Sequence, residues 1–140
     1  MSGLCLEDLT IGQCAEAARE IGAADIDAFA AVSGDHNPVH LDEAFAATTQ
    51  FGGRIAHGML SASYISALIA SELPGPGAIY LSQTLKFLRP VRIGDTVTTR
   101  VEITAIDSAK ARVTLATTCQ VDNKTVLTGE AVILAPRKGD

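Results

Sequence analysis

Hydrophobic residues recur at a helical spacing in the first half of the chain and at every second position in much of the second half. Residues 25–32 carry Ile26 and Phe29 three positions apart, which predicts a short helix. A second short helix is predicted over residues 42–49, with Asp42 as its N-cap. The remainder of the N-terminal third reads as loops between short helices.

Residues 58–72 are predicted to form the longest helix. Large apolar side chains point around much of its circumference, and the other positions are mostly glycine, alanine or serine. A helix that is apolar or small on nearly every side is buried on nearly every side. Pro74 and Pro76 follow it and prevent its continuation.

Four segments in the second half are rich in Val, Ile, Thr and Leu and are predicted to be strands, namely residues 79–88, 96–106, 111–121 and 125–134. Short loops join the last three, which implies antiparallel neighbours. One buried helix followed by a run of antiparallel strands indicates the α+β class. The economical arrangement is an antiparallel sheet wrapped around the central buried helix, a hot-dog fold, in a single domain over residues 1–140.

The composition limits the classes of partner. Hydrophobic residues make up 47% of the 140 residues, which argues against disorder, and the net charge is −5. Lysine and arginine form no cluster, so neither a nucleic-acid partner nor a membrane partner is expected. An anionic ligand would need a local basic site set against the overall charge.

The cysteines Cys5, Cys14 and Cys119 are few, odd in number and widely spaced. This pattern argues against a disulfide framework and is typical of a reducing compartment. The first residues lack the basic and then apolar order of a secretory signal, and the longest apolar stretch is too short to span a bilayer comfortably. We therefore expect a cytoplasmic location.

The densest group of polar residues occupies residues 33–42. Asp35 and His40 lie five positions apart across a turn at Asn37 and Pro38, so both can face one cleft. A carboxylate held beside an imidazole is what a water-activating acid–base pair needs. Asp and Asn beside Pro are equally ordinary turn formers, and the spacing alone does not choose between the two interpretations.

A metal site is not expected in this segment. His36 and His40 are four positions apart, but Pro38 lies between them and interrupts any common helical face. The chain has only three histidines and no cysteine near this pair, so the usual ligand set for zinc is missing. His36 is then a solvated residue or a minor pocket contact.

Gly58 stands at the start of the long predicted helix. The first turn of a helix has unpaired N–H groups and positive dipole character, and glycine has no side chain to block a ligand. The Gly58 N–H would then polarise a carbonyl, as an oxyanion hole does. The alternative is that Gly58 only allows close packing, and His57 before it is equally a cap or a packing residue.

Other polar residues give weaker signals. Tyr64 and Ser66 lie on the same helix, where either can line a pocket, although core packing is the default for Tyr64. Arg89 and Arg92 lie between two predicted strands and can meet phosphates, but isolated arginines are usually solvated.

One segment closely resembles the G-D-x-N-P-[LIV]-H motif of MaoC-like hydratases, namely residues 34–40, Gly-Asp-His-Asn-Pro-Val-His. Residues 44–46, 55–60 and 87–95 also resemble that family and come in the same order. The likeness covers about residues 11–135, and the chain length is similar to that of stand-alone bacterial (R)-specific enoyl-CoA hydratases. Some of those enzymes supply precursors for polyhydroxyalkanoate synthesis.

The resemblance implies roles for individual residues. Asp35 and His40 match the catalytic pair of the family, and Asn37 matches the position that helps to shape the catalytic turn. Gly58 matches the residue whose N–H polarises the thioester carbonyl. Ser66 matches a helix residue associated with the active-site pocket.

The implied reaction is the reversible syn addition of water to a trans-2-enoyl-CoA, which gives an (R)-3-hydroxyacyl-CoA. It needs no metal and no redox cofactor, because the CoA thioester is itself the substrate. The family also implies a homodimer with its sheets paired edge to edge. Two other functions remain open: a hot-dog acyl-CoA thioesterase, since that fold hosts both activities, and a non-catalytic acyl-CoA-binding module.

Overall fold

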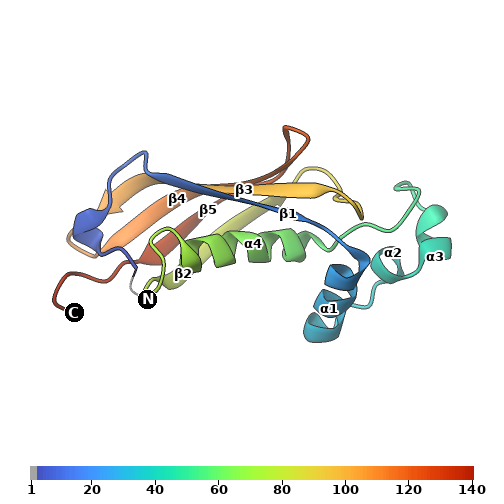
Figure 1. The fold of residues 1–140 in the computed structure, drawn as a ribbon, viewed down its shortest axis with the longest axis horizontal. Helices are drawn as coiled ribbons and strands as arrows, with labels where there is room; N and C mark the ends of the chain where they lie inside the picture. Colours follow the sequence, from blue (N-terminus) through green and yellow to red (C-terminus); the bar gives the residue numbers. More distant parts are fainter. Residues whose placement is uncertain (1–2) are drawn as a thin grey trace.

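A computed structural model describes residues 3–140, so the first two residues of the predicted domain lie outside the described part. The elements follow one another as η1 (Leu6–Asp8), β1 (Cys14–Glu20), α1 (Ala23–Ser33), α2 (Pro38–Leu41), α3 (Glu43–Ala47), α4 (Gly58–Ser71), β2 (Ile79–Phe87), β3 (Thr96–Asp107), β4 (Arg112–Val121) and β5 (Lys124–Leu134). Figure 1 shows the sheet lying along α4, with α1, α2 and α3 beyond the end at which α4 begins.

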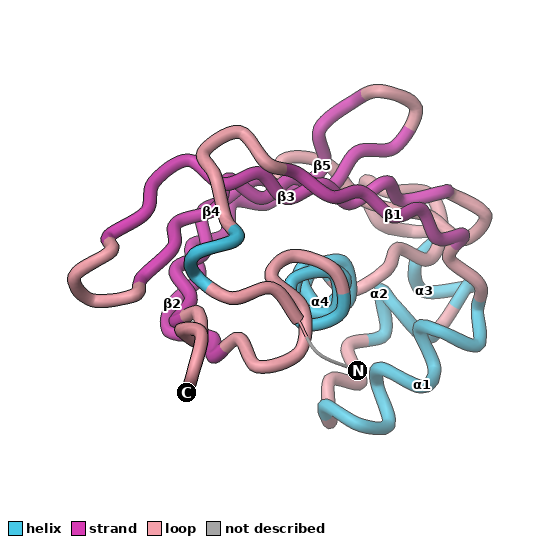
Figure 2. Tube along the Cα trace, turned by 60° about the vertical axis from the view of Figure 1, so that its left-hand side comes forward, coloured by secondary structure: helices cyan, strands magenta, loops and turns pink. Residues whose placement is uncertain are grey.

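The strands form one antiparallel sheet in the order β1-β3-β4-β5-β2. In Figure 2 the sheet curves over α4, which is seen nearly end-on beneath it. The predicted α+β hot-dog fold is confirmed. The helix predicted over residues 58–72 and the four predicted strands are present within a few residues of their expected limits.

The core lies between α4 and the inner face of the sheet. From the helix come Leu60, Ile65, Leu68 and Ile69, all nearly or fully buried. Alternate residues of β3 and β4 meet them, as the burial patterns of both strands show. Each such aliphatic side chain contributes on the order of 1.5–3 kcal/mol when fully buried.

Helix α4 is buried on fewer sides than its composition indicates. Its small residues Ser63, Ser66, Ala67 and Ala70 are exposed, on the side away from the sheet. The physical reason is that a single sheet covers one face of a helix and leaves the opposite face open. The prediction of burial on nearly every side is therefore wrong for the isolated chain.

Strand β1 is an element that the hydrophobic pattern did not predict. Its sequence, Cys-Ala-Glu-Ala-Ala-Arg-Glu, has no large apolar residues, and nearly all of its side chains are exposed. Its backbone pairs with β3, from Cys14 opposite Glu102 to Glu20 opposite Thr96. An edge strand of this kind is held by its hydrogen-bond ladder more than by side-chain burial, so the expectation of loops and short helices in this region is wrong.

The two ends of the described chain are tied together at the far end of α4. Leu4 N–H donates to the Pro74 carbonyl at 2.7 Å, just beyond the helix. Leu6 N–H donates to the Pro136 carbonyl at 2.8 Å, and Lys138 pairs with Asp8 at 3.0 Å. These contacts lie at the end of α4 remote from Gly58.

Two further expectations concern the thiols and the membrane. Cys5, Cys14 and Cys119 are free, and burial raises the pKa of the Cys119 thiol. Within residues 3–140, no helix has the length and apolar character needed to cross a membrane.

Candidate active site

The turn that carries Asp35 begins where α1 ends. Gly34 caps α1 in the left-handed conformation, with φ 80°, which a glycine adopts at little cost. The Asp35 carboxylate accepts from the Asn37 N–H at 3.2 Å, and the Asn37 side-chain oxygen accepts from the Val39 N–H at 3.2 Å. Pro38 occupies the first turn of α2, where its missing N–H is not needed. Asn37 thus shapes this turn as its N-cap, and Pro38 starts a helix there.

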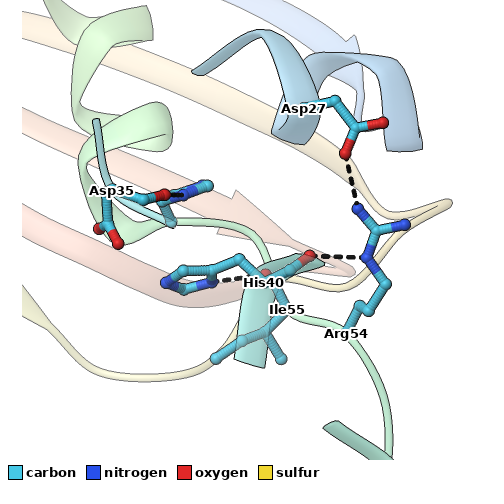
Figure 3. A network of polar contacts seen from close by, with 6 residues as sticks. Asp27, Asp35, His40, Arg54 and Ile55 are labelled. Carbon is cyan, nitrogen blue, oxygen red and sulfur yellow. Dashed lines mark hydrogen bonds and ion pairs between the residues drawn. The ribbon is translucent and has the colours of Figure 1, made fainter. Parts of the chain in front are cut away.

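His40 is held by backbone groups on both sides. Its Nδ1 lies 2.8 Å from the Ile55 carbonyl, which can only accept, so Nδ1 carries a hydrogen, and in the neutral ring the lone pair is on Nε2. The His40 carbonyl accepts from Arg54 Nε at 2.6 Å, and the Arg54 guanidinium pairs with Asp27 at 3.0 Å. Figure 3 shows Arg54 lying between Asp27 of α1 and the backbone of His40.

Asp35, His40 and His57 come together as one cluster. Each offers one side-chain atom, and these atoms all lie within 4.8 Å of one another. The His57 ring stacks on the His40 ring with centroids 3.9 Å apart and an interplanar angle of 28°, and only 2% of His57 is exposed. The sequence left His57 as a cap or packing residue, and its only local signal is its place before Gly58.

The geometry of this cluster does not favour a shared metal ion. His40 Nδ1 and His57 Nε2 both face backbone carbonyls, at 2.8 Å and 3.1 Å. A nitrogen that donates to a carbonyl cannot bind a metal, so each ring has only its other nitrogen left for one. The absence of a metal from the reaction stays a prediction.

Gly58 is the first residue of α4. Its N–H has no acceptor within residues 3–140, as expected for the first position of a helix. A Cβ built on Gly58 would lie 2.6 Å from the Phe87 ring, closer than carbon atoms approach without a shift. The structure therefore supports both sequence interpretations, because the glycine leaves an N–H unpaired and also admits Phe87.

A cleft of about 420 Å³ lies beside His40, His57 and Gly58. His40, His57 and Gly58 line it together with the largely apolar side chains of Met59, Phe87, Leu88, Val126 and Leu127. Arg89 also lines the cleft, and its side chain is exposed. A mostly apolar cleft with a few convergent polar groups is typical of a small-molecule site.

The structure does not bring Ser66 to this cleft. Ser66 is exposed on α4, two turns beyond Gly58, and its role in the pocket stays a prediction. A different serine lines the cleft: Ser61 is 2% exposed, and within residues 3–140 its hydroxyl has no hydrogen-bond partner. Tyr64 lies elsewhere, with the Arg19 guanidinium 5.5 Å from the centre of its ring.

Comparison with known proteins decides the family. Residues 10–125 match the family described as MaoC like domain. The chain belongs to the MaoC-like domain family. It is 53% identical over 133 residues to the (R)-specific enoyl-CoA hydratase of Rhodospirillum rubrum, covering 95% of this chain and 92% of that protein.

Two solved structures are also similar. An R-hydratase from Pseudomonas aeruginosa superposes with a TM-score of 0.93 at 52% identity, covering 97% of this chain and 88% of that one. The (R)-hydratase of Aeromonas caviae superposes with a TM-score of 0.91 at 49% identity, covering 93% of this chain and 99% of that one. The MaoC-like fold therefore extends over nearly the whole chain.

Replacing Gly58 by valine separates the two roles left open for this glycine. If its N–H holds a substrate carbonyl, Gly58→Val obstructs the carbonyl site, and kcat falls by about a hundredfold to a thousandfold, the usual cost of one oxyanion donor. Phe87→Ala, alone and combined with Gly58→Val, is the control, because it removes the ring that a side chain at position 58 would strike. Recovery of activity in the double variant would show that Gly58 serves packing alone.

Proposed function

We propose that this MaoC-like protein is an (R)-specific enoyl-CoA hydratase that adds water reversibly to trans-2-enoyl-CoA. The observation that carries the proposal is the arrangement of three groups beside one cleft. His40 and Gly58 line the cleft, and the Gly58 N–H has no acceptor within residues 3–140. The Asp35 carboxylate lies within 4.8 Å of a ring nitrogen of His40, a spacing that allows one water between them. Hydration of an enoyl thioester needs an activated water and a donor for the thioester oxygen.

The steps follow from the roles of these groups. Asp35 and His40 hold one water and take up its proton as its oxygen bonds to the β carbon of the enoyl group. The negative charge that develops moves to the thioester oxygen, where the Gly58 N–H stabilises it. A proton from the same pair then reaches the α carbon. Because one pair manages both additions, they occur on one face, and the product is a single enantiomer.

The relatives support the substrate class and a metabolic role. The Rhodospirillum rubrum relative is an (R)-specific enoyl-CoA hydratase, and the Aeromonas caviae (R)-hydratase is involved in PHA biosynthesis. This chain aligns with both at about half identity over nearly its full length. We extend the same role to it, as a cytoplasmic supplier of (R)-3-hydroxyacyl-CoA that needs no cofactor besides its CoA thioester substrate.

A spectrophotometric assay with crotonyl-CoA separates the proposal from its alternatives. Hydration removes the enoyl absorbance without releasing a thiol, whereas a hot-dog thioesterase releases free CoA thiol. A non-catalytic acyl-CoA-binding module does neither. Release of thiol, or an unchanged spectrum with saturable binding, would replace the proposed function.

Substitution of the acid–base pair tests the mechanism. Asp35→Asn keeps the size and removes the base, and His40→Gln keeps hydrogen-bonding capacity and removes the titratable nitrogen. Each should lower kcat by at least the ~10²–10⁴-fold typical of acid–base catalysis, and the two losses should be far from additive. Circular dichroism should stay native, because the Asp35 side chain is exposed and His40 is only half-buried.

The product's handedness gives the matching control. Coupling hydration to an (S)-specific 3-hydroxyacyl-CoA dehydrogenase should yield almost no NADH if the product is the (R) enantiomer. Strong NADH formation, or substantial activity in both substituted proteins, would contradict the assignment.

Arg89 is the residue on this cleft that we expect to meet the CoA moiety. It is exposed at the cleft, and its hydrogen bond to the Thr125 carbonyl is long, at 3.4 Å. We expect Arg89→Gln to raise KM for crotonyl-CoA by about threefold to tenfold, the range for a partly solvated contact to an anion. The KM for the N-acetylcysteamine thioester, which lacks the phosphates, should not change.

Arg112→Gln is the matched control for the lost charge. Arg112 is exposed at the start of β4, at the other end of the strand from the hairpin that reaches the cleft. An equal rise in KM for both thioesters in Arg89→Gln, or the same rise in Arg112→Gln, would count against a CoA contact at Arg89.

The protein is proposed to act as a homodimer. Within residues 3–140, strand β2 pairs only with β5 and has no partner at its outer edge, and its residues Ile79, Tyr80 and Leu81 are exposed. An exposed apolar edge strand favours pairing with another strand. The exposed small residues of α4 give a partner subunit a second surface to pack against. Sedimentation velocity should give a dimer at assay concentrations, and a stable active monomer would refute this.

A further inference from the structure

His57 makes contacts with each of the two groups in the proposed acid–base pair. Its Nε2 lies 3.1 Å from the backbone carbonyl of Asp35, and its ring face lies on the ring of His40. On the side of α1 it meets Phe29, with ring centroids 4.8 Å apart. Its own backbone is the N-cap of α4, directly before Gly58.

These contacts fix the form of the His57 ring. Because a carbonyl can only accept, Nε2 carries a hydrogen and donates it to the Asp35 carbonyl, and in the neutral ring the lone pair is on Nδ1. Within residues 3–140, Nδ1 is buried and has no hydrogen-bond partner. A buried polar atom without a partner is destabilising, so an apolar ring of the same size would suit the packing better.

We infer that His57 is a positioning residue, which holds the Asp35 turn and the His40 ring in register with the Gly58 N–H. The inference rests on the proposed function and goes beyond the roles implied for Asp35, His40 and Gly58. It rests on the observation that a histidine occupies a buried position where packing alone favours a hydrocarbon ring. The hydrogen bond to Asp35 is the contact that phenylalanine would lack.

The connection is short and rigid. Asp35 lies on the turn between α1 and α2, where its N–H donates to the Ser33 hydroxyl and its carboxylate accepts from the Asn37 N–H. Both helices lie beyond the start of α4. The bond from His57 joins that turn to the N-cap of α4, and the stacked rings set the distance between His40 and the helix start. A displacement of about 1 Å between reacting groups can cost on the order of a hundredfold in rate.

Two variants separate positioning from packing. His57→Phe keeps a ring against His40 and Phe29 and removes the donor and the unpaired nitrogen. His57→Gln places an amide N–H the same number of bonds from the backbone and removes the ring. His36→Gln, an exposed histidine in the same turn, is the matched control and should keep normal activity and stability.

We expect His57→Phe to lower kcat for crotonyl-CoA by about tenfold to a hundredfold, with KM within about twofold of the wild-type value. Its melting temperature should be equal or higher, because an unpaired buried nitrogen is gone. His57→Gln should recover part of the lost kcat. In the Asp35→Asn background, His57→Phe should cost little more, because a positioning residue acts through the group that it positions.

Several results would overturn the inference. They are a His57→Phe protein with normal kcat, a loss confined to KM, equal losses in the Phe and Gln variants, or losses that add to that of Asp35→Asn. If the wild-type protein leaves crotonyl-CoA unchanged, the proposed function fails instead. The positioning role is then tested by NMR. His57→Phe should shift the amide signals of Asp35 and Asn37, and unchanged signals at these two residues would contradict the inference.

Discussion

Helix α4 is packed along the inner face of the sheet, so its position is set by the core and its first unpaired N–H groups are delivered to a fixed point. That point is Gly58, at the wall of the cleft. A helix that begins in open water would satisfy the same N–H with solvent. Here the start of the helix adjoins a largely apolar cleft, and the Gly58 N–H has no acceptor within residues 3–140, which is why we propose it as the donor to a ligand oxygen. The rest of the site is arranged around this point.

Backbone carbonyls position most of the side chains of the site. The carbonyl of Ile55 selects the hydrogen position on His40, and the carbonyl of Asp35 does the same for His57. The carbonyl of His40 binds Arg54, which reaches α1 through Asp27. Since carbonyls only accept, each contact fixes a donor without ambiguity. The proposed catalytic groups therefore depend on the path of the chain as much as on neighbouring side chains.

The sequence predicted those parts that have a local signature. The apolar and small residues of 58–72 predicted the central helix, and alternation predicted β2 to β5. The motif at residues 34–40 singled out Asp35, Asn37 and His40, and the structure brings Asp35 and His40 together, while their catalytic roles stay a prediction. Strand β1 has no such signature, because an exposed edge strand is held by backbone pairing with β3, and pairing leaves no periodic pattern.

The missing parts of the site are long-range contacts. His57 lies 22 positions from Asp35 and Arg54 lies 27 from Asp27, and no spacing rule connects residues so far apart. Phe87 comes close to Gly58 because the sheet, with β2 at its edge, curves over α4. Ser66 is the opposite case. The resemblance in sequence implies that it belongs to the pocket, but in the single chain it does not line the cleft.

The tie between the chain ends has a practical consequence. Asp8 and Lys138 clasp the two ends together beyond the last turn of α4, at the opposite end of that helix from the catalytic turn. A purification tag or a fluorescent partner fused at either end would thus stand away from the cleft.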